Sequence, residues 1–325
     1  MTTTSDSIQY NCDASLSDIR EALISWFGDA ARNLPWRRTR DPYHILVAEV
    51  MLQQTQVDRV VPKYQMFLDQ FPTIEALAAA PTSEVIRAWS GLGYNRRAVN
   101  MQRTARAVLE QYGGEFPHDI TEMRALPGIG PYTAGALACF AYEQDVAFMD
   151  TNIRRVLRRV FVGPEERNTT SEAKLLTIAQ AAVPPSKGWI WNQAIMELGA
   201  LICTAASPAC WRCPLRTYCR DYTARRTNDE QLFEKAAATR VQPRQRHLAE
   251  RRESSYAGSN RFYRGRIVET LRQQPHGTPL ALGELGRRIK EGFDDDEQAW
   301  LLALLEGLAR DGLVLLEGES VQLPE

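Results

Sequence analysis

Apolar residues recur at helical spacing along most of this chain. Between Ser15 and about Leu34 the period is clear, and Ser15 suits the N-cap of a helix whose apolar positions are Leu16, Ile19, Leu23, Trp26 and Phe27. The segment from Ile45 to Phe71 repeats this period, and shorter helices follow, separated by Pro81, Gly91, Gly93, Gly113, Gly114 and Pro117. Since no convincing strand alternation precedes about residue 310, the pattern predicts an all-α body with short connections.

The pattern changes after Arg225. Apolar residues thin out as far as Arg266. Between Arg240 and Arg266 only Glu250 and Glu253 oppose a series of arginines, namely Arg240, Arg244, Arg246, Arg251, Arg252, Arg261, Arg264 and Arg266. We therefore expect residues 225–262 to form a basic linker, which is either simply solvated or an arm that contacts phosphates.

Residues 263–325 carry the pattern of a small folded unit. The segments YRGRIVETLRQ, LGELGRRIKEGF and EQAWLLALLEGLARDG predict three helices, and LVLLEGESVQLPE predicts two short strands around a Gly-Glu turn. This order suggests a winged-helix-like domain. Such domains bind proteins as often as DNA, and the acidic run from Asp294 to Glu297 weakens the DNA interpretation.

Composition and charge are typical of a soluble globular protein. The 325 residues suffice for about two domains, and 44% hydrophobic with 24% charged residues excludes disordered, collagen-like and fibrous chains. The formal charge of -1 provides no overall attraction to nucleic acid, so DNA binding would depend on local patches. No stretch approaches the roughly 18 apolar residues of a membrane span, and residues 1–14, expected to be a flexible tail, do not resemble a signal peptide, so we expect a cytoplasmic protein.

Four of the six cysteines fall within one seventeen-residue window, at Cys203, Cys210, Cys213 and Cys219. A secreted disulfide scaffold would be shorter and would spread its cysteines along the chain, so metal ligation is the better interpretation. Four thiolates on a tight loop hold either zinc or an iron-sulfur cluster. The C-x6-C-x2-C-x5-C spacing leaves both open but favours the cluster, because only one short Cys-x-x-Cys pair is present. Cys12 and Cys139 stand apart, and both are expected only to pack.

The segment LPGIGPYTAGAL places Gly128 and Gly130 in a helix-breaking turn and restarts a helix near Pro131. Glycine permits close approach to the backbone, and exposed N–H groups at a helix start can hold a phosphate oxygen. A Pro-Gly-x-Gly sequence by itself is a weak signal, because ordinary turns between helices contain it too.

Two carboxylates stand in apolar surroundings. Asp150 follows three apolar residues, and it is either the N-cap of the next helix or a functional carboxylate. Glu49 interrupts the apolar run ILVAEVML, either on the wet face of its helix or as an acid in a dry pocket. Periodicity does not distinguish these alternatives.

Together, the LPGIGPYTAGAL turn, the aspartate of MDTNIRRV and the four-cysteine loop resemble the helix-hairpin-helix base-excision DNA glycosylases that carry a [4Fe-4S] cluster. Within that superfamily, LPWR, AEVMLQQTQV, GLGYNRRAVN and NQAIMELGALICT resemble the adenine DNA glycosylases of the MutY family, which remove adenine misincorporated opposite 8-oxoguanine. The resemblance covers roughly residues 16 to 222 and implies that the cofactor is a [4Fe-4S] cluster. It also implies a discontinuous cluster domain, 15–36 with 141–224, and a six-helix domain over 37–140.

The resemblance implies that Glu49 is the catalytic acid and Asp150 the second carboxylate. Breaking an N-glycosidic bond requires a proton for the departing purine and stabilisation of an oxocarbenium-like sugar, so one carboxyl group must be protonated and the other ionised. We hypothesise that Glu49 has a raised pKa in an apolar pocket and protonates adenine N7, while Asp150 stays charged beneath the sugar. Asn152 would orient Asp150 or a water molecule.

The resemblance also implies three sets of DNA contacts. The pocket for the extruded base would contain Leu34, Trp36, Arg37 and Gln193, the residues that enter the vacated stack would be Gln54 and Tyr94, and the N–H groups that bind phosphate would come from Leu126, Gly128 and Gly130. For Leu34, Trp36 and Tyr94 the alternative is ordinary core packing. Tyr132 stands where strand-cutting relatives carry a lysine that forms a Schiff base, so we expect a monofunctional glycosylase.

Two departures from the family pattern matter. Asn95 stands where the family usually has a second tyrosine, and no Nudix-like domain that reads 8-oxoguanine is recognisable after residue 225. Discrimination of 8-oxoguanine from guanine would then have to come from the loops of Tyr94 and Gln54. The alternatives are a thymine or uracil mismatch glycosylase of the same fold and a non-catalytic iron-sulfur protein that binds DNA. The expected partner is mismatched duplex DNA, bound by a monomer, at the nucleoid if the source is bacterial.

Overall fold

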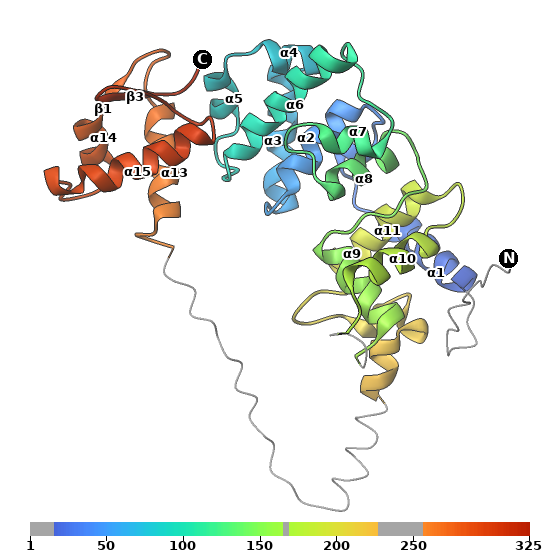
Figure 1. Cartoon of the computed structure of the whole chain (residues 1–325). Helices are drawn as coiled ribbons and strands as arrows, with labels where there is room; N and C mark the ends of the chain where they lie inside the picture. The colour runs from blue at the N-terminus through green and yellow to red at the C-terminus, as the bar shows by residue number, and fades with distance from the viewer. Residues whose placement is uncertain (1–15, 165–168, 227–255) are drawn as a thin grey trace, which may run out of the picture. The chain divides into compact units, whose positions relative to one another are not determined.

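The computed structural model describes residues 16–164, 169–226 and 256–325 (Figure 1). Within these ranges the protein is mainly helical, with three short strands near the C-terminus, so the all-α fold class is confirmed. The expected tail and residues 227–255 of the expected linker lie outside the described residues. None of the described helices has both the length and the apolarity that crossing a membrane requires. The chain divides into two compact units, one containing residues 1–33 and 138–245 and the other residues 34–137 and 246–325.

The first unit is built from helices around α11. Its elements are α1 (Leu16–Ala30), α9 (Thr151–Leu157), the π-helical turn η2 (Arg158–Val162), α10 (Glu172–Ala182), α11 (Gly188–Leu201) and the short turns η3 (Cys210–Arg212) and η4 (Arg216–Tyr218). Helix α11 packs against both α1 and α9. After α1, the Arg32 guanidinium donates two hydrogen bonds of 2.8 Å to the buried carboxylate of Glu197 on α11, which ties the two helices together.

The second unit contains the helices that follow. They are η1 (Pro35–Arg37), α2 (Pro42–Leu52), α3 (Val57–Gln70), α4 (Ile74–Ala79), α5 (Thr82–Ala88), α6 (Arg96–Tyr112), α7 (Ile120–Ala125) and α8 (Pro131–Phe140). Seven α-helices therefore lie between Pro42 and Phe140, a stretch that is described in full, whereas the family resemblance implied six over residues 37–140. Pro81 separates α4 from α5, as the sequence pattern predicted, because proline cannot continue the hydrogen-bonding pattern of a helix.

Helix α2 is apolar on every side and is buried from Tyr43 to Met51, apart from the half-buried His44. Its start is well defined, because the Asp41 side chain accepts hydrogen bonds from the N–H groups of Tyr43 and His44 at 2.7 and 3.2 Å. Glu49 lies on this helix and is only 4% exposed. The alternative that placed Glu49 on a wet helix face is therefore wrong.

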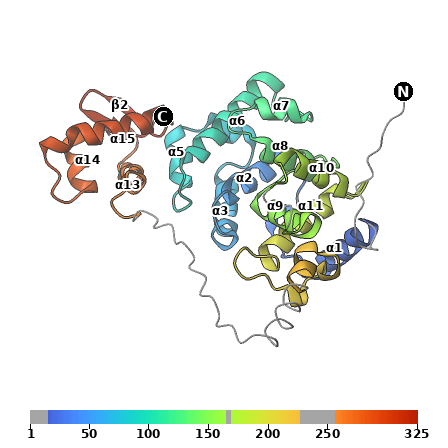
Figure 2. The ribbon, with the colours of Figure 1, turned by 60° about the horizontal axis from the view of Figure 1, so that its bottom comes forward.

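Residues 256–325 belong to the second unit and have the element order expected of a winged-helix-like fold. The elements are α13 (Asn260–Arg272), β1 (Leu280–Ala281), α14 (Leu282–Ile289), η5 (Asp295–Glu297), α15 (Gln298–Arg310), β2 (Leu315–Glu317) and β3 (Ser320–Gln322). Strand β3 pairs antiparallel with both β1 and β2, and β1 was not predicted because two residues carry no alternation. Helix α13 packs against α5 (Figures 1 and 2), and Ile86 and Val99 join the hydrophobic core of the C-terminal helices.

Candidate active site

A hydrogen bond between two distant segments marks the centre of the candidate site. The hydroxyl of Tyr132, in the first turn of α8, donates to Oε2 of Glu49 at 2.7 Å. Glu49 is surrounded by the apolar residues of α2, and Tyr132 is half-buried. Burial in apolar surroundings disfavours the charged form of a carboxyl group, so a carboxyl group in this position is suited to carry a proton.

The turn between α7 and α8 positions Tyr132. Gly128 has a φ of +79°, and a Cβ atom there would lie 2.8 Å from Cβ of Asn100, so only glycine fits. Within the described residues, the N–H groups of Gly128 and Gly130 donate to no acceptor, whereas the N–H of Leu126 already donates to Met123 O at 3.2 Å. The expectation that Leu126 offers its N–H to a phosphate therefore conflicts with the structure, because that group closes the end of α7.

Asp150 is the N-cap of α9, and its second carboxylate oxygen is also bound, while its role as a functional carboxylate stays a prediction. Its Oδ1 accepts from the N–H of Ile153 at 2.6 Å, which makes it the N-cap of α9, and its Oδ2 accepts from Nδ2 of Asn152 at 3.0 Å. Asn152 in turn accepts from Arg155 at 2.7 Å. The carboxylate is held in one orientation, and it belongs to the first unit whereas Glu49 belongs to the second.

Arg155 extends this network, and the sequence reasoning assigned it no role. Its guanidinium also donates to Gly199 O at 2.7 Å and to Cys203 O at 2.6 Å. Gly199 packs closely on α9, since a Cβ atom there would lie 2.7 Å from Cβ of Asn152. The segment NQAIMELGALICT thus provides both the close approach to α9 and the acceptors for Arg155.

The residues predicted to form the base pocket differ in exposure. Leu34 and Trp36 are each 7% exposed, and Trp36 packs edge-on against Tyr64 with 5.4 Å between ring centroids. Both side chains therefore contribute to the core, and their place in the base pocket stays a prediction. Gln193 is also buried, in the first unit, whereas Arg37 is partly exposed on η1.

Gln54 and Tyr94 lie on two exposed loops with strained backbones. Their φ angles are +55° and +46°, and Tyr94 is 42% exposed, so Tyr94 is not a core residue. Arg97, which the sequence reasoning missed, holds both loops. Its guanidinium donates to carbonyl groups on both sides, at Val50, Met51, Gln53, Leu92 and Gly93. Burial lowers the pKa of Arg97 to about 10, so it remains charged at neutral pH.

Asn95, the departure from the family pattern, has a defined contact. Its Oδ1 accepts a hydrogen bond of 2.8 Å from Arg272 on α13, and Arg272 also donates to Ile86 O at 2.9 Å. The side chain at position 95 therefore attaches the C-terminal helices to the Tyr94 loop.

The four clustered cysteines line one small cavity together with Leu198 and Ile202. All four are free thiols. Burial raises the pKa of Cys213 to about 11 and that of Cys219 to about 12, and neighbouring thiols add to both rises. Such thiols become thiolates only beside a strong positive charge. In the described part of the chain no three His, Cys, Asp or Glu side chains are placed to hold a single metal ion.

Comparisons with known proteins agree on one family. The model of the family described as "HhH-GPD superfamily base excision DNA repair protein" matches residues 47–180. The adenine DNA glycosylase of Mycolicibacterium smegmatis is 37% identical over 303 residues, which cover 92% of this chain and 96% of that protein. The adenine DNA glycosylase of Homo sapiens is 41% identical over 230 residues, which cover 68% of this chain but only 42% of that protein.

Two solved structures have a similar fold. A thermostable thymine-DNA glycosylase has a TM-score of 0.61 with 30% identity and covers 64% of this chain and 97% of its own. Endonuclease III in a non-covalent complex with DNA has a TM-score of 0.56 with 26% identity and covers 66% of this chain and 99% of its own. Because the Mycolicibacterium match covers 92% of the chain, it includes most of residues 256–325, whereas the two solved structures cover 64% and 66% of the chain.

Proposed function

The chain belongs to the adenine DNA glycosylases of the helix-hairpin-helix base-excision repair superfamily, and we propose that it hydrolyses the N-glycosidic bond of adenine mispaired with 8-oxoguanine or guanine in duplex DNA. The observation that carries this proposal is the buried Glu49 with its hydrogen bond from Tyr132. An acid kept in dry surroundings and oriented by a phenol is suited to protonate a leaving base.

In the proposed reaction Glu49 donates its proton to adenine N7, and the bond between C1′ and N9 breaks as the base departs. The sugar develops positive charge, which the carboxylate of Asp150 stabilises. Two donors hold this carboxylate, the Ile153 N–H and Asn152 Nδ2, so little reorganisation is needed as the charge develops. A water molecule adds to C1′ and loses a proton to the carboxylate of Glu49, which restores the acid, and the products are free adenine and an abasic site.

The same residues explain why we propose no strand cleavage. A lyase needs an amine that forms a Schiff base with the opened sugar. Tyr132 occupies that position with a hydroxyl group that is already hydrogen-bonded to Glu49. Strong borohydride trapping of the protein on abasic DNA would contradict this part of the proposal.

DNA binding in this proposal uses the exposed loops and the α7–α8 turn. Gln54 and Tyr94 enter the stack that the extruded adenine leaves, and the N–H groups of Gly128 and Gly130 bind a phosphate. Arg37 and Gln193 supply the polar groups of the base pocket. The exposed loop conformations and the two unengaged glycine amides support these assignments.

We further propose that Cys203, Cys210, Cys213 and Cys219 hold a [4Fe-4S] cluster. The cluster would supply the positive charge that these buried thiolates require and would shape their loop. Arg159 stabilises the same loop, because its guanidinium donates to Cys203 Sγ at 3.3 Å and to Thr204 O at 2.7 Å.

The test is single-turnover excision on four duplexes, with adenine opposite 8-oxoguanine, adenine opposite guanine, thymine opposite guanine and uracil opposite guanine. We expect adenine release by the wild type and its loss in Glu49→Gln and Asp150→Asn, with folding checked by circular dichroism. Glu110→Gln is the matched control, because Glu110 is exposed on α6. Excision by Glu49→Gln at the wild-type rate would refute the assignment of the acid.

A second substrate has one specific observation in its favour, which is the similarity to a solved thymine-DNA glycosylase at 30% identity. If thymine or uracil were released and adenine were not, the assigned roles of the two carboxylates would stand, but the proposed substrate would be wrong. Tight binding of mismatched duplexes without release of any base would favour a non-catalytic DNA-binding protein.

A further inference from the structure

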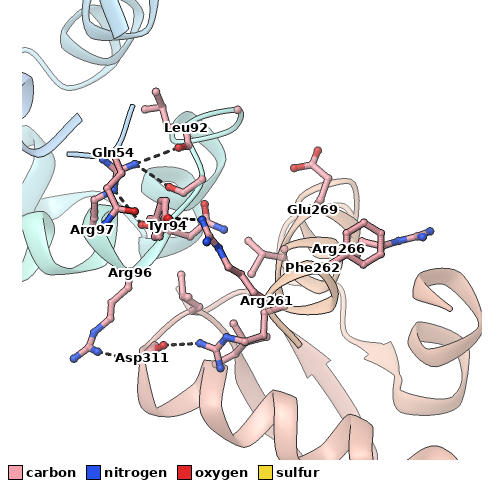
Figure 3. A pocket seen from close by; sticks show the side chains of 18 of the residues that line it. Gln54, Leu92, Tyr94, Arg96, Arg97, Arg261, Phe262, Arg266, Glu269 and Asp311 are labelled. Carbon is pink, nitrogen blue, oxygen red and sulfur yellow. Dashed lines mark hydrogen bonds and ion pairs between the residues drawn. The ribbon is translucent and has the colours of Figure 1, made fainter. Parts of the chain in front are cut away.

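A cleft of about 1000 Å³ lies within the second unit, between α13 and the loops of Gln54 and Tyr94 (Figure 3). Seven arginines line it, and only two carboxylates, Glu269 and Asp311, oppose them. The cleft therefore carries a strong local positive charge in a chain whose formal net charge is -1.

Both carboxylates are already paired inside the cleft. Asp311 binds Arg264 at 2.6 Å and Arg96 at 3.4 Å through different carboxylate oxygens. Glu269 binds Arg272 at 3.0 Å, and Arg272 is the side chain that docks α13. These pairs stabilise the walls of the cleft.

The remaining arginines of α13 have no such partner. Arg261 and Arg266 are exposed, and neither forms an ion pair with a carboxylate of the described residues. Arg59 lines the opposite wall, and it too is exposed and forms no ion pair with a carboxylate of the described residues. Unpaired guanidinium groups that face each other across a cleft attract a polyanion such as the DNA backbone.

Aromatic rings alternate with these charges, and those of Tyr94 and Tyr256 are exposed. Arg261 lies over the ring of Tyr94 at 4.4 Å from its centroid and over that of Tyr256 at 5.7 Å, and it also donates to the Tyr94 hydroxyl. Arg266 lies over the ring of Phe262 at 5.6 Å. Figure 3 shows Arg261 extending from α13 toward Tyr94. A basic groove with interleaved aromatic rings is suited to unpaired nucleotides, which stack and are held by their phosphates.

We infer that this cleft binds the DNA strand opposite the target adenine, and that Arg261 contacts the base that loses its partner when the adenine is extruded. The inference rests on the proposed function, in which Tyr94 enters the vacated stack, so that a base beside Tyr94 lies within reach of Arg261. An arginine side chain offers only donors. 8-Oxoguanine carries a carbonyl oxygen at C8 where guanine has a C–H, while its N7 changes from an acceptor to an N–H donor, so the contact that we infer is from Arg261 to O8, which guanine lacks. The C-terminal helices thereby provide a preference for the oxidised base.

The test uses the full chain and fluorescence anisotropy, with duplexes that carry a non-cleavable abasic analogue opposite either 8-oxoguanine or guanine. We expect Arg261→Met to lower the ratio of the two affinities by about 10-fold, which is the discrimination that one good contact to a base edge supplies. Arg266→Met should weaken both duplexes alike and reduce the slope of log affinity against log salt by about one. Arg287→Met is the control, since Arg287 is exposed on α14 outside the cleft.

Each outcome decides one of the statements. A wild-type chain that binds both duplexes equally, or an Arg261→Met variant that keeps the wild-type ratio, would overturn the role of Arg261. An Arg266→Met variant with an unchanged salt slope would overturn the cleft as a DNA site. If Arg261 only braced the Tyr94 loop, Arg261→Met would lower the melting temperature and weaken both duplexes equally.

The binding assay needs no excision, so it separates this inference from the proposed function. A wild-type chain that released no adenine but lost DNA affinity through these variants would refute the glycosylase proposal and leave the cleft as a DNA site. Normal excision of adenine, together with unchanged DNA binding in both variants, would refute the cleft as a DNA site and leave the glycosylase proposal standing.

Discussion

Arg97 offers the sharpest test of how the fold supports the DNA-contacting loops. It donates to Val50 O at 2.7 Å and to Met51 O at 3.0 Å, at the end of α2, where helical carbonyl groups lack partners within the helix. It also reaches Gln53 O at 2.5 Å in the loop that precedes Gln54. Arg97→Met keeps the aliphatic stem and removes every one of these donors.

The expected loss of stability follows from these contacts. A hydrogen bond from a charged donor contributes about 1.5 to 3 kcal/mol, and the two helix-end carbonyl groups have no replacement partner. Desolvation of the guanidinium, which lowers the pKa of Arg97 to about 10, offsets part of this gain. We therefore expect Arg97→Met to lower the free energy of unfolding by about 2 to 4 kcal/mol, a large share of the typical total of about 5 to 15 kcal/mol.

Urea unfolding followed by circular dichroism measures this loss, and duplex binding measures the loosening of the Gln54 and Tyr94 loops. Arg97→Lys, which keeps the charge but not the planar set of donors, should lose about half as much. Arg103→Met on the exposed side of α6 is the control and should change stability by no more than about 0.5 kcal/mol. A loss below about 1 kcal/mol in Arg97→Met, with DNA affinity intact, would refute the reasoning.

Three further predictions concern separate parts of the chain. Tyr132→Phe removes the donor to Glu49 and should slow single-turnover excision by about 10-fold with the fold unchanged, whereas a wild-type rate would mean that the hydrogen bond does not orient the acid. Arg32→Met removes the guanidinium partner of the buried Glu197, which keeps the backbone N–H of residue 32 as a donor, and should cost about 2 to 3 kcal/mol in thermal or urea unfolding; a loss within experimental error would contradict this. Cys213→Ser should reduce bound iron and sulfide and the visible absorbance of the purified protein, and full iron content would rule out Cys213 as a ligand.

Several local features of the fold were predictable because the signals that set them act over a few residues. Asp41 before a proline starts α2, and Asp150 starts α9, since short acidic side chains cap helices wherever the next N–H groups are free. Gly128 marks the turn before α8, because its left-handed backbone is strained for any other residue. The strand β1 was missed, because two residues form a strand only when β3 is present beside them.

By itself the sequence determined the helical fold class, the three C-terminal helices with the last two strands, and the cysteine window, and it predicted which residues carry the catalytic chemistry. Tertiary structure alone decided what those residues meet. Glu49 lies on a helix that is apolar on every side, so periodicity offered no face to assign it, and its hydroxyl partner is 83 residues away. Arg261 and Tyr94 are separated by 167 residues, and Arg97 collects carbonyl groups from two loops. Such contacts depend on how helices pack, which no local pattern encodes, and the cleft on α13 is therefore visible only in the folded chain.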